Sequence, residues 1–91
     1  MVHTLQITIG SGVTQVSTTS VPVKQVIFQN NGGTNTARVG GIGASSTVGA
    51  KLAISGGTPL ALGNGDAYCA DLREFYIAGT QNDVIDVTYI A

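Results

Sequence analysis

Alternation of apolar and polar residues at both ends of the chain predicts β-strands. Near the N-terminus Leu5, Ile7 and Ile9 alternate with polar residues, and residues 84–90 repeat the pattern at the C-terminus. A period of two residues places successive side chains on opposite faces of a strand. We therefore expect a half-buried strand at each end. Residues 1–12 are expected to form either this first strand or an N-terminal arm that pairs with a neighbouring sheet.

Further segments rich in β-branched and aromatic residues lie between clusters of turn-forming residues. Strands are expected at residues 13–19, 23–29, 36–41, 50–54 and 73–78, with an extended segment at 68–70. The segment Asn30-Asn31-Gly32-Gly33 tolerates positive φ, so we expect a hairpin that joins residues 23–29 to 36–41. Residues 40–49 are small and glycine-rich, which favours a long loop or an irregular edge strand.

The spacing of these segments predicts the fold class. No segment repeats apolar residues with the period of a long helix, and the strands recur at short, regular intervals. We expect an all-β fold of seven to eight short strands, either a small antiparallel β-sandwich or a jelly-roll-like barrel, with no substantial helix. Residues 1–91 are expected to form a single domain, since the chain is short.

The composition favours a surface built for assembly. Charged residues make up 10% of the 91 residues, against about 25% in ordinary soluble domains. An uncharged polar surface costs less to desolvate than a charged one. A domain this small usually needs an additional source of stability, and one cysteine cannot form an internal disulfide. We therefore expect a homo-oligomer.

Charge and hydropathy argue against two classes of partner. The net charge is −1, and Lys24, Arg38, Lys51 and Arg73 are spread singly along the chain. This spacing predicts no basic patch and therefore no nucleic-acid partner. No apolar run approaches the roughly 20 residues that span a bilayer, and the alternating N-terminus differs from an apolar signal segment. We expect no membrane association.

The residues that usually carry catalysis or bind metal are scarce. His3 is the only histidine, and no acid lies near it in the sequence. Cys69 has apolar neighbours, which predicts a buried, unreactive thiol. Asp83 and Asp86 are the closest candidates for a calcium site, although turn and strand positions explain them more simply. We expect no enzyme activity, no metal and no cofactor.

Three residues are candidates for a protein interface. Arg38 precedes the glycine-rich segment, where it is a candidate charged anchor, and a solvated strand position is the simpler interpretation. Ile42 lies within that segment, which would act as a contact arm. Tyr76 is expected on the strand face opposite Phe75 and Ile77, where its large ring and hydroxyl suit an intersubunit surface.

A series of short motifs resembles small virion proteins of tailed bacteriophages. In order they are KQVIFQN at residues 24–30, ARVG at 37–40, TPLALGNG at 58–65, DLREFYIAG at 71–79 and VIDVTYI at 84–90. The resemblance covers residues 21–91, and each motif also has a structural reason in a turn or a core position. Residues 41–49 depart from it, because this loop is longer than usual.

The resemblance implies a β-sandwich that binds other virion proteins. The leading expectation is a capsid decoration or cement protein, a homotrimer that binds the major capsid protein on the virion exterior after assembly in the host cytoplasm. The alternative is a tail fibre or spike module that recognises a host receptor or glycan, which predicts an exposed aromatic residue or a polar pocket near Tyr68 or Tyr76. An enzyme accessory or inhibitor domain is a third class, which no motif favours.

Overall fold

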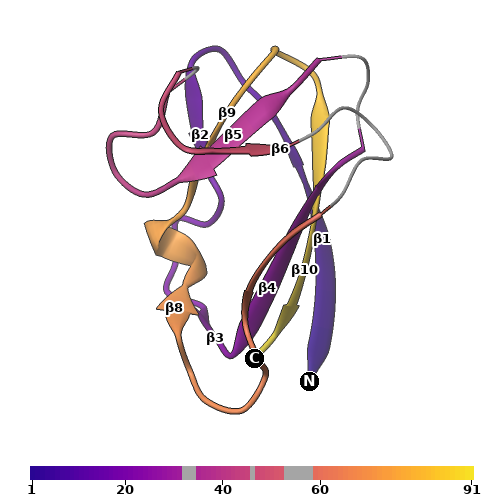
Figure 1. The fold of residues 1–91 in the computed structure, drawn as a ribbon, viewed down its shortest axis with the longest axis vertical. Coiled ribbons are helices and arrows are strands. Elements are labelled where there is room, and N and C mark those ends of the chain that lie inside the picture. Colours follow the sequence, from indigo (N-terminus) through magenta and orange to yellow (C-terminus); the bar gives the residue numbers. More distant parts are fainter. Residues whose placement is uncertain (32–34, 46, 53–58) are drawn as a thin grey trace.

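The computed structural model describes residues 1–31, 35–45, 47–52 and 59–91, and this part of the chain is all-β (Figure 1). It contains strands and one short 3-10 helix, and none of these residues lies in an α-helix. The elements are β1 (Val2–Thr8), β2 (Val13–Gln15), β3 (Pro22–Val23), β4 (Gln25–Asn30), β5 (Ala37–Gly40), β6 (Ala50–Leu52), β7 (Leu60–Gly63), β8 (Ala70–Asp71), η1 (Leu72–Glu74), β9 (Tyr76–Ala78) and β10 (Val84–Ile90).

Two four-stranded antiparallel sheets form the body of the molecule. The first has the strand order β1-β10-β4-β7 and the second β2-β9-β5-β6, while β3 and β8 form a separate two-stranded ladder. One hydrophobic cluster contains Phe28 and Val87 from the first sheet together with Val39 and Ile77 from the second. The fold is therefore a small β-sandwich, which confirms the predicted all-β class.

The alternating sequence explains which side chains fill this core. In β4 every second residue is buried, and in β10 the alternation buries Ile85 and Val87. Burial of such aliphatic side chains contributes about 1.5–3 kcal/mol each. Residues 2–8 form β1, which pairs along its whole length with β10 of the same chain. The first of the two interpretations of the N-terminal segment therefore describes the structure.

The predicted hairpin at residues 30–33 is wrong. β4 pairs with β10 on one side and β7 on the other, so neither of its edges is open to β5. The chain instead crosses to the second sheet, where β5 pairs with β6 and β9. Buried Asn30 supports the crossing, because its side-chain Nδ2 donates a 2.8 Å hydrogen bond to the carbonyl oxygen of Asn35. Residues 32–34 lie outside the described part.

Several strand boundaries also differ from the prediction. The strand expected at 73–78 begins only at Tyr76, because Asp71 caps the 3-10 helix Leu72–Glu74. Residues 60–63 form β7, a segment for which no strand was predicted. The described residues contain ten strands, more than the seven or eight expected. Residues 53 and 54 of the segment predicted at 50–54 lie outside the described part.

Candidate functional site

Two of the three candidate interface residues, Arg38 and Tyr76, lie on the outer face of the second sheet. The third, Ile42, lies in the loop that follows β5. Tyr76 in β9 pairs with Gly40 of β5, and two residues further along the ladder Arg38 of β5 pairs with Ala78. Because alternate residues share a face, Tyr76 and Arg38 lie opposite the buried side chains of Val39 and Ile77. We call this outer surface, with the adjoining Ile42 loop, the Tyr76 face.

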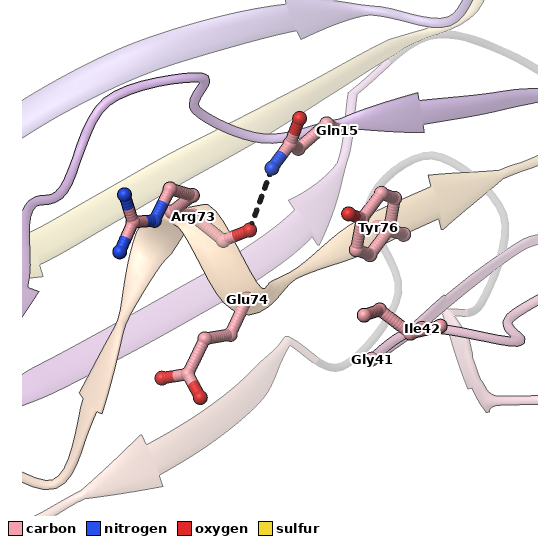
Figure 2. A pocket seen from close by; sticks show the side chains of 6 residues that line it. All are labelled: Gln15, Gly41, Ile42, Arg73, Glu74 and Tyr76. Carbon is pink, nitrogen blue, oxygen red and sulfur yellow. Dashed lines mark hydrogen bonds between the residues drawn. The ribbon is translucent and has the colours of Figure 1, made fainter.

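A hollow of about 470 Å³ lies at one end of the Tyr76 face. Figure 2 shows Tyr76 and Ile42 beside each other in this hollow. Its lining is formed by Gln15, Gly41, Ile42, Arg73, Glu74 and Tyr76. Three segments that are separate in the sequence therefore meet here: β2, the loop after β5, and the continuous segment of η1 and β9.

A tight turn holds Ile42 away from the protein. The N–H of Ala44 donates a 3.1 Å hydrogen bond to the carbonyl oxygen of Gly41, and Gly43 has φ +99°. A glycine with positive φ at the third position is typical of a type II turn, which places Ile42 at the second position. The Ile42 side chain is 91% exposed. The loop thus presents an aliphatic side chain to solvent at the rim of the hollow.

Hydrogen bonds fix the opposite side of the hollow. The side-chain Nε2 of Gln15 donates a 2.8 Å bond to the carbonyl oxygen of Arg73, shown dashed in Figure 2. The Val16 N–H donates a 2.9 Å bond to the carbonyl oxygen of Phe75. β2 is therefore tied to the segment that carries Arg73 and Glu74. The hollow has one anchored wall and one wall formed by the Ile42 loop.

The Asp71 carboxylate organises η1 beneath this wall. It accepts hydrogen bonds from the hydroxyl of Ser20 and from the N–H groups of Arg73 and Val21, which hold the pKa of Asp71 below its ordinary value. In return, Oε1 of Glu74 accepts a 3.0 Å bond from the Asp71 N–H. This reciprocal capping box fixes the start of the helix.

Arg38 lies in a second hollow on the Tyr76 face. This hollow has a volume of about 280 Å³, and Arg38 shares it with Lys51. The two residues are direct partners across β5 and β6, and Nη1 of Arg38 donates a 2.9 Å bond to the carbonyl oxygen of Gly49. Arg38 is therefore half-buried and anchored to the loop after Ile42, at a short distance in the sheet from the first hollow.

Three of the four lysine and arginine residues of the chain line the two hollows. They are Arg38, Lys51 and Arg73, and Glu74 is the acidic residue beside them. The sequence did not indicate this gathering, because these cations lie far apart along the chain. The fourth, Lys24, places its Nζ over the ring of Tyr68, 5.2 Å from the ring centroid.

Other residues that the sequence singled out lie away from the Tyr76 face. His3, in the first sheet, stacks on Tyr89 with ring centroids 5.1 Å apart. Cys69 is exposed, so the prediction of a buried thiol is wrong. It precedes the short ladder of β3 and β8 and therefore remains at the surface, with Sγ 3.6 Å from the carbonyl oxygen of Lys24. Tyr68 is also exposed, at 62%.

The arrangement is suited to binding by side-chain contact. Among the described residues that line the two hollows, the ionisable groups belong to Arg, Lys, Glu and Tyr, with no histidine or cysteine. Across the described ranges, His, Cys, Asp and Glu nowhere gather in groups of three that would hold a metal ion. Nor does any helix there have the length and apolar character needed to cross a membrane.

The scan against family models, the search of curated proteins and the search of solved structures each found no match.

Proposed function

We propose that the protein is a structural binding module that docks through the Tyr76 face onto another protein, most concretely as a decoration or cement protein on a bacteriophage capsid. The observation that carries this proposal is the 91% exposed Ile42 beside Tyr76. Burying an isoleucine side chain against a partner contributes about 1.5–3 kcal/mol. A tight turn that holds such a side chain in solvent leaves this contribution available to a partner.

The chemistry of the Tyr76 face defines the expected partner surface. Tyr76 offers a large ring with a hydrogen-bonding hydroxyl, and tyrosine and arginine are enriched among the residues that dominate binding energy. Arg38, Lys51 and Arg73 make the surroundings positive, with Glu74 as the acidic exception. We expect the partner to provide an apolar pocket for Ile42, bordered by acidic residues. In the capsid proposal this surface belongs to the major capsid protein.

Co-sedimentation tests the proposal. Purified protein is mixed with capsids that lack it, and the bound fraction is measured against concentration. We expect saturable binding that Ile42→Asp weakens at least about tenfold, because a charged group replaces a side chain that becomes desolvated. Tyr76→Ala should weaken it as well. The matched control is Val48→Asp, since Val48 is 57% exposed in the same loop but does not line the hollow.

Two results would reject this function. Capsid binding that is unaffected by Ile42→Asp and Tyr76→Ala would show that another surface docks. Absence of any saturable binding to capsids would reject the decoration role itself. Thermal unfolding of each variant checks that the fold is intact, and Ile42→Asp should change the free energy of unfolding by less than about 0.5 kcal/mol, as expected for an exposed site.

The second candidate is recognition of a host receptor or glycan by a tail fibre or spike module. The observation that favours it is the exposed ring of Tyr68, which lines neither hollow and carries Lys24 over it. An exposed aromatic ring offers a stacking surface for a ligand. Attachment of labelled protein to host cells, lost in Tyr68→Ala and retained in Ile42→Asp, would support recognition over decoration.

A further inference from the structure

Among the described residues, β1 is the longest edge strand of the two four-stranded sheets, and it has none of the usual protection. It lies at the margin of the first sheet (Figure 1) and spans seven residues, VHTLQIT, without Lys, Arg, Asp, Glu, Pro or Gly. Natural edge strands are usually short, charged or interrupted, because an open edge pairs with other chains. The other three edges of the four-stranded sheets, as far as the structure describes them, fit that description: β2 and β6 have three residues each, and β7 ends at Gly63 with φ +87°.

The backbone bonds at the two ends of β1 show which groups face this edge. The backbone nitrogen of Met1 donates a 3.1 Å hydrogen bond to the carbonyl oxygen of Ala91, and the N–H of Ala91 donates a 3.0 Å bond to the carbonyl oxygen of Met1. At the other end, the Ile9 N–H donates a 2.8 Å hydrogen bond to the carbonyl oxygen of Asp83. In an antiparallel ladder such pairs alternate with pairs that make no mutual bond. The odd-numbered residues of β1 therefore bond to β10.

The even-numbered residues consequently direct their N–H and carbonyl groups toward the open edge. These residues are Val2, Thr4, Gln6 and Thr8, and all four are exposed. Two further contacts agree with this alternation. The hydroxyls of Thr4 and Thr88 lie 3.5 Å apart, as expected for a close pair without mutual backbone bonds, and the N–H of Gly10 turns to the Thr14 hydroxyl at 2.9 Å.

We propose that this edge binds a second copy of the same chain, with the two β1 strands antiparallel about a two-fold axis at Leu5. This register pairs Val2 with Thr8 of the second copy and Thr4 with Gln6 of the second copy, so every outward backbone group of the four residues is bonded. Registers centred on Thr4 or Gln6 leave one of the four residues without a partner. The pairing joins two four-stranded sheets into one sheet of eight strands.

The side chains are complementary in the same register. On the inner face Leu5 meets Leu5 of the second copy, at the close spacing of a pair without mutual hydrogen bonds. Leu5 and Ile7 already pack against the core from its border, so the second copy extends the core at this edge. On the outer face the pairs are uncharged, and no like charges oppose each other.

The pairing is isologous and closes as a dimer. It therefore differs from the trimer implied by the resemblance to virion proteins. It is also independent of docking through the Tyr76 face, which lies on the other sheet. A variant of that face, Ile42→Asp, is expected to leave the dimer unchanged.

Amide exchange and sedimentation equilibrium on the wild-type chain test the proposal without any substitution. At concentrations where the mass is that of a dimer, the amides of Thr4, Gln6 and Thr8 should exchange slowly, as is also expected for Leu5 and Ile7, which bond to β10. On dilution to monomer, protection of the even-numbered amides should fall by at least about tenfold while the odd-numbered amides stay protected.

A proline substitution isolates the outward backbone bond. Gln6→Pro removes an N–H that makes no bond within the chain's own sheet, and proline is tolerated on edge strands. We expect a dimer dissociation constant at least about tenfold higher than for the wild type. The control Gln6→Ala keeps the N–H and should retain the dimer. Protection of the Leu5 and Ile7 amides in Gln6→Pro verifies that β1 is still folded.

Three outcomes would overturn the proposal. The first is a monomeric mass at all concentrations up to about the millimolar range, at which even weak specific association is populated. The second is a dimer in which the even-numbered amides of β1 exchange rapidly, because that dimer would form elsewhere. The third is equal dimer affinity in Gln6→Pro and Gln6→Ala.

Discussion

The carboxylate of Asp71 accepts a 2.8 Å hydrogen bond from the backbone N–H of Val21, which lies fifty residues earlier in the chain. The same carboxylate accepts a 2.9 Å bond from the N–H of Arg73 and a bond from the hydroxyl of Ser20. It therefore caps η1 and attaches that helix to the segment before β3. One side chain links the wall of the first hollow to the body of the sandwich.

Replacing Asp71 is expected to destabilise the protein in a pH-dependent manner. The hydrogen bonds from Ser20, Arg73 and Val21 favour the ionised carboxylate and lower its pKa from the ordinary value of 3.8. This contribution to stability is fully present above pH 3.8 and is lost as the pH falls through the lowered pKa of the folded state. Urea unfolding should show Asp71→Ala less stable than the wild type at pH 7, with the difference shrinking near pH 2.

Asp71→Asn is the matched control for charge. Its amide oxygen still accepts bonds at the start of η1, but the side chain does not ionise. Its stability relative to the wild type should also vary with pH, whereas the difference between the Asn and Ala variants should not. A difference between wild type and Asp71→Ala that is the same at pH 7 and pH 2 would contradict the role of the carboxylate charge.

Gly63→Ala is expected to lower the free energy of unfolding by about 2–4 kcal/mol, a large single-site loss. Gly63 has φ +87°, and a Cβ at this position would clash with the carbonyl oxygen of Lys24. Gly12 provides the control, since its φ is +83° but no atom lies within 4 Å of the added Cβ. Gly12→Ala should lower the free energy of unfolding by only about 1–2 kcal/mol, the cost of holding an alanine at positive φ. Equal losses in chemical denaturation would refute the predicted clash.

Phe28→Ala is expected to lower the free energy of unfolding by about 3–5 kcal/mol. Phe28 is 0% exposed at the centre of the sandwich, and its ring centroid lies 5.2 Å from that of Phe75. Tyr68→Ala removes an aromatic ring of similar size that is 62% exposed, so it should cost less than about 1 kcal/mol. Thermal or urea unfolding distinguishes the two, and a loss in Tyr68→Ala as large as in Phe28→Ala would contradict the described packing.

Asn30→Leu is expected to destabilise the crossing between the sheets by about 1–3 kcal/mol. Asn30 is 3% exposed and donates to the carbonyl oxygen of Asn35 through a side-chain amide that leucine lacks. Asn31→Ala is the neighbouring control, because Asn31 is exposed and uses its backbone N–H to bond the carbonyl oxygen of Val84. Asn31→Ala should change the free energy of unfolding by less than about 0.5 kcal/mol. The reverse order of the two variants in urea unfolding would disprove this role of Asn30.

Local patterns were sufficient to predict most strands and their buried faces. The alternation at residues 84–90 correctly predicted β10, in which Ile85 and Val87 are buried. The turn signal at residues 30–33 marked the end of β4 correctly but indicated the wrong neighbour for it. Turn-forming residues allow the chain to change direction, whereas the sheet that it enters depends on which strand edges other segments already occupy.

For the candidate site, too, the sequence predicted individual residues, and the tertiary structure decided which of them lie together. The sequence singled out Arg38, Ile42 and Tyr76 separately, and the structure places Ile42 and Tyr76 in one hollow and Arg38 on the same outer face. Gln15 was not predicted to belong to this site, because only the pairing of β2 with β9 brings it beside Tyr76. The burial of Cys69 was predicted from its apolar neighbours alone. These neighbours do not determine the exposure of a residue that precedes a two-residue strand, and Cys69 is exposed.

By itself the sequence determined that the chain forms short strands with defined inner and outer faces, because the direction of a side chain on a strand depends only on its position in a two-residue period. Only the tertiary structure decided which strands are neighbours, which cations gather on the Tyr76 face and which strand, β1, is left as the long open edge. These features depend on contacts between residues far apart in the chain, such as Met1 and Ala91, and no local pattern encodes the order in which strands pair.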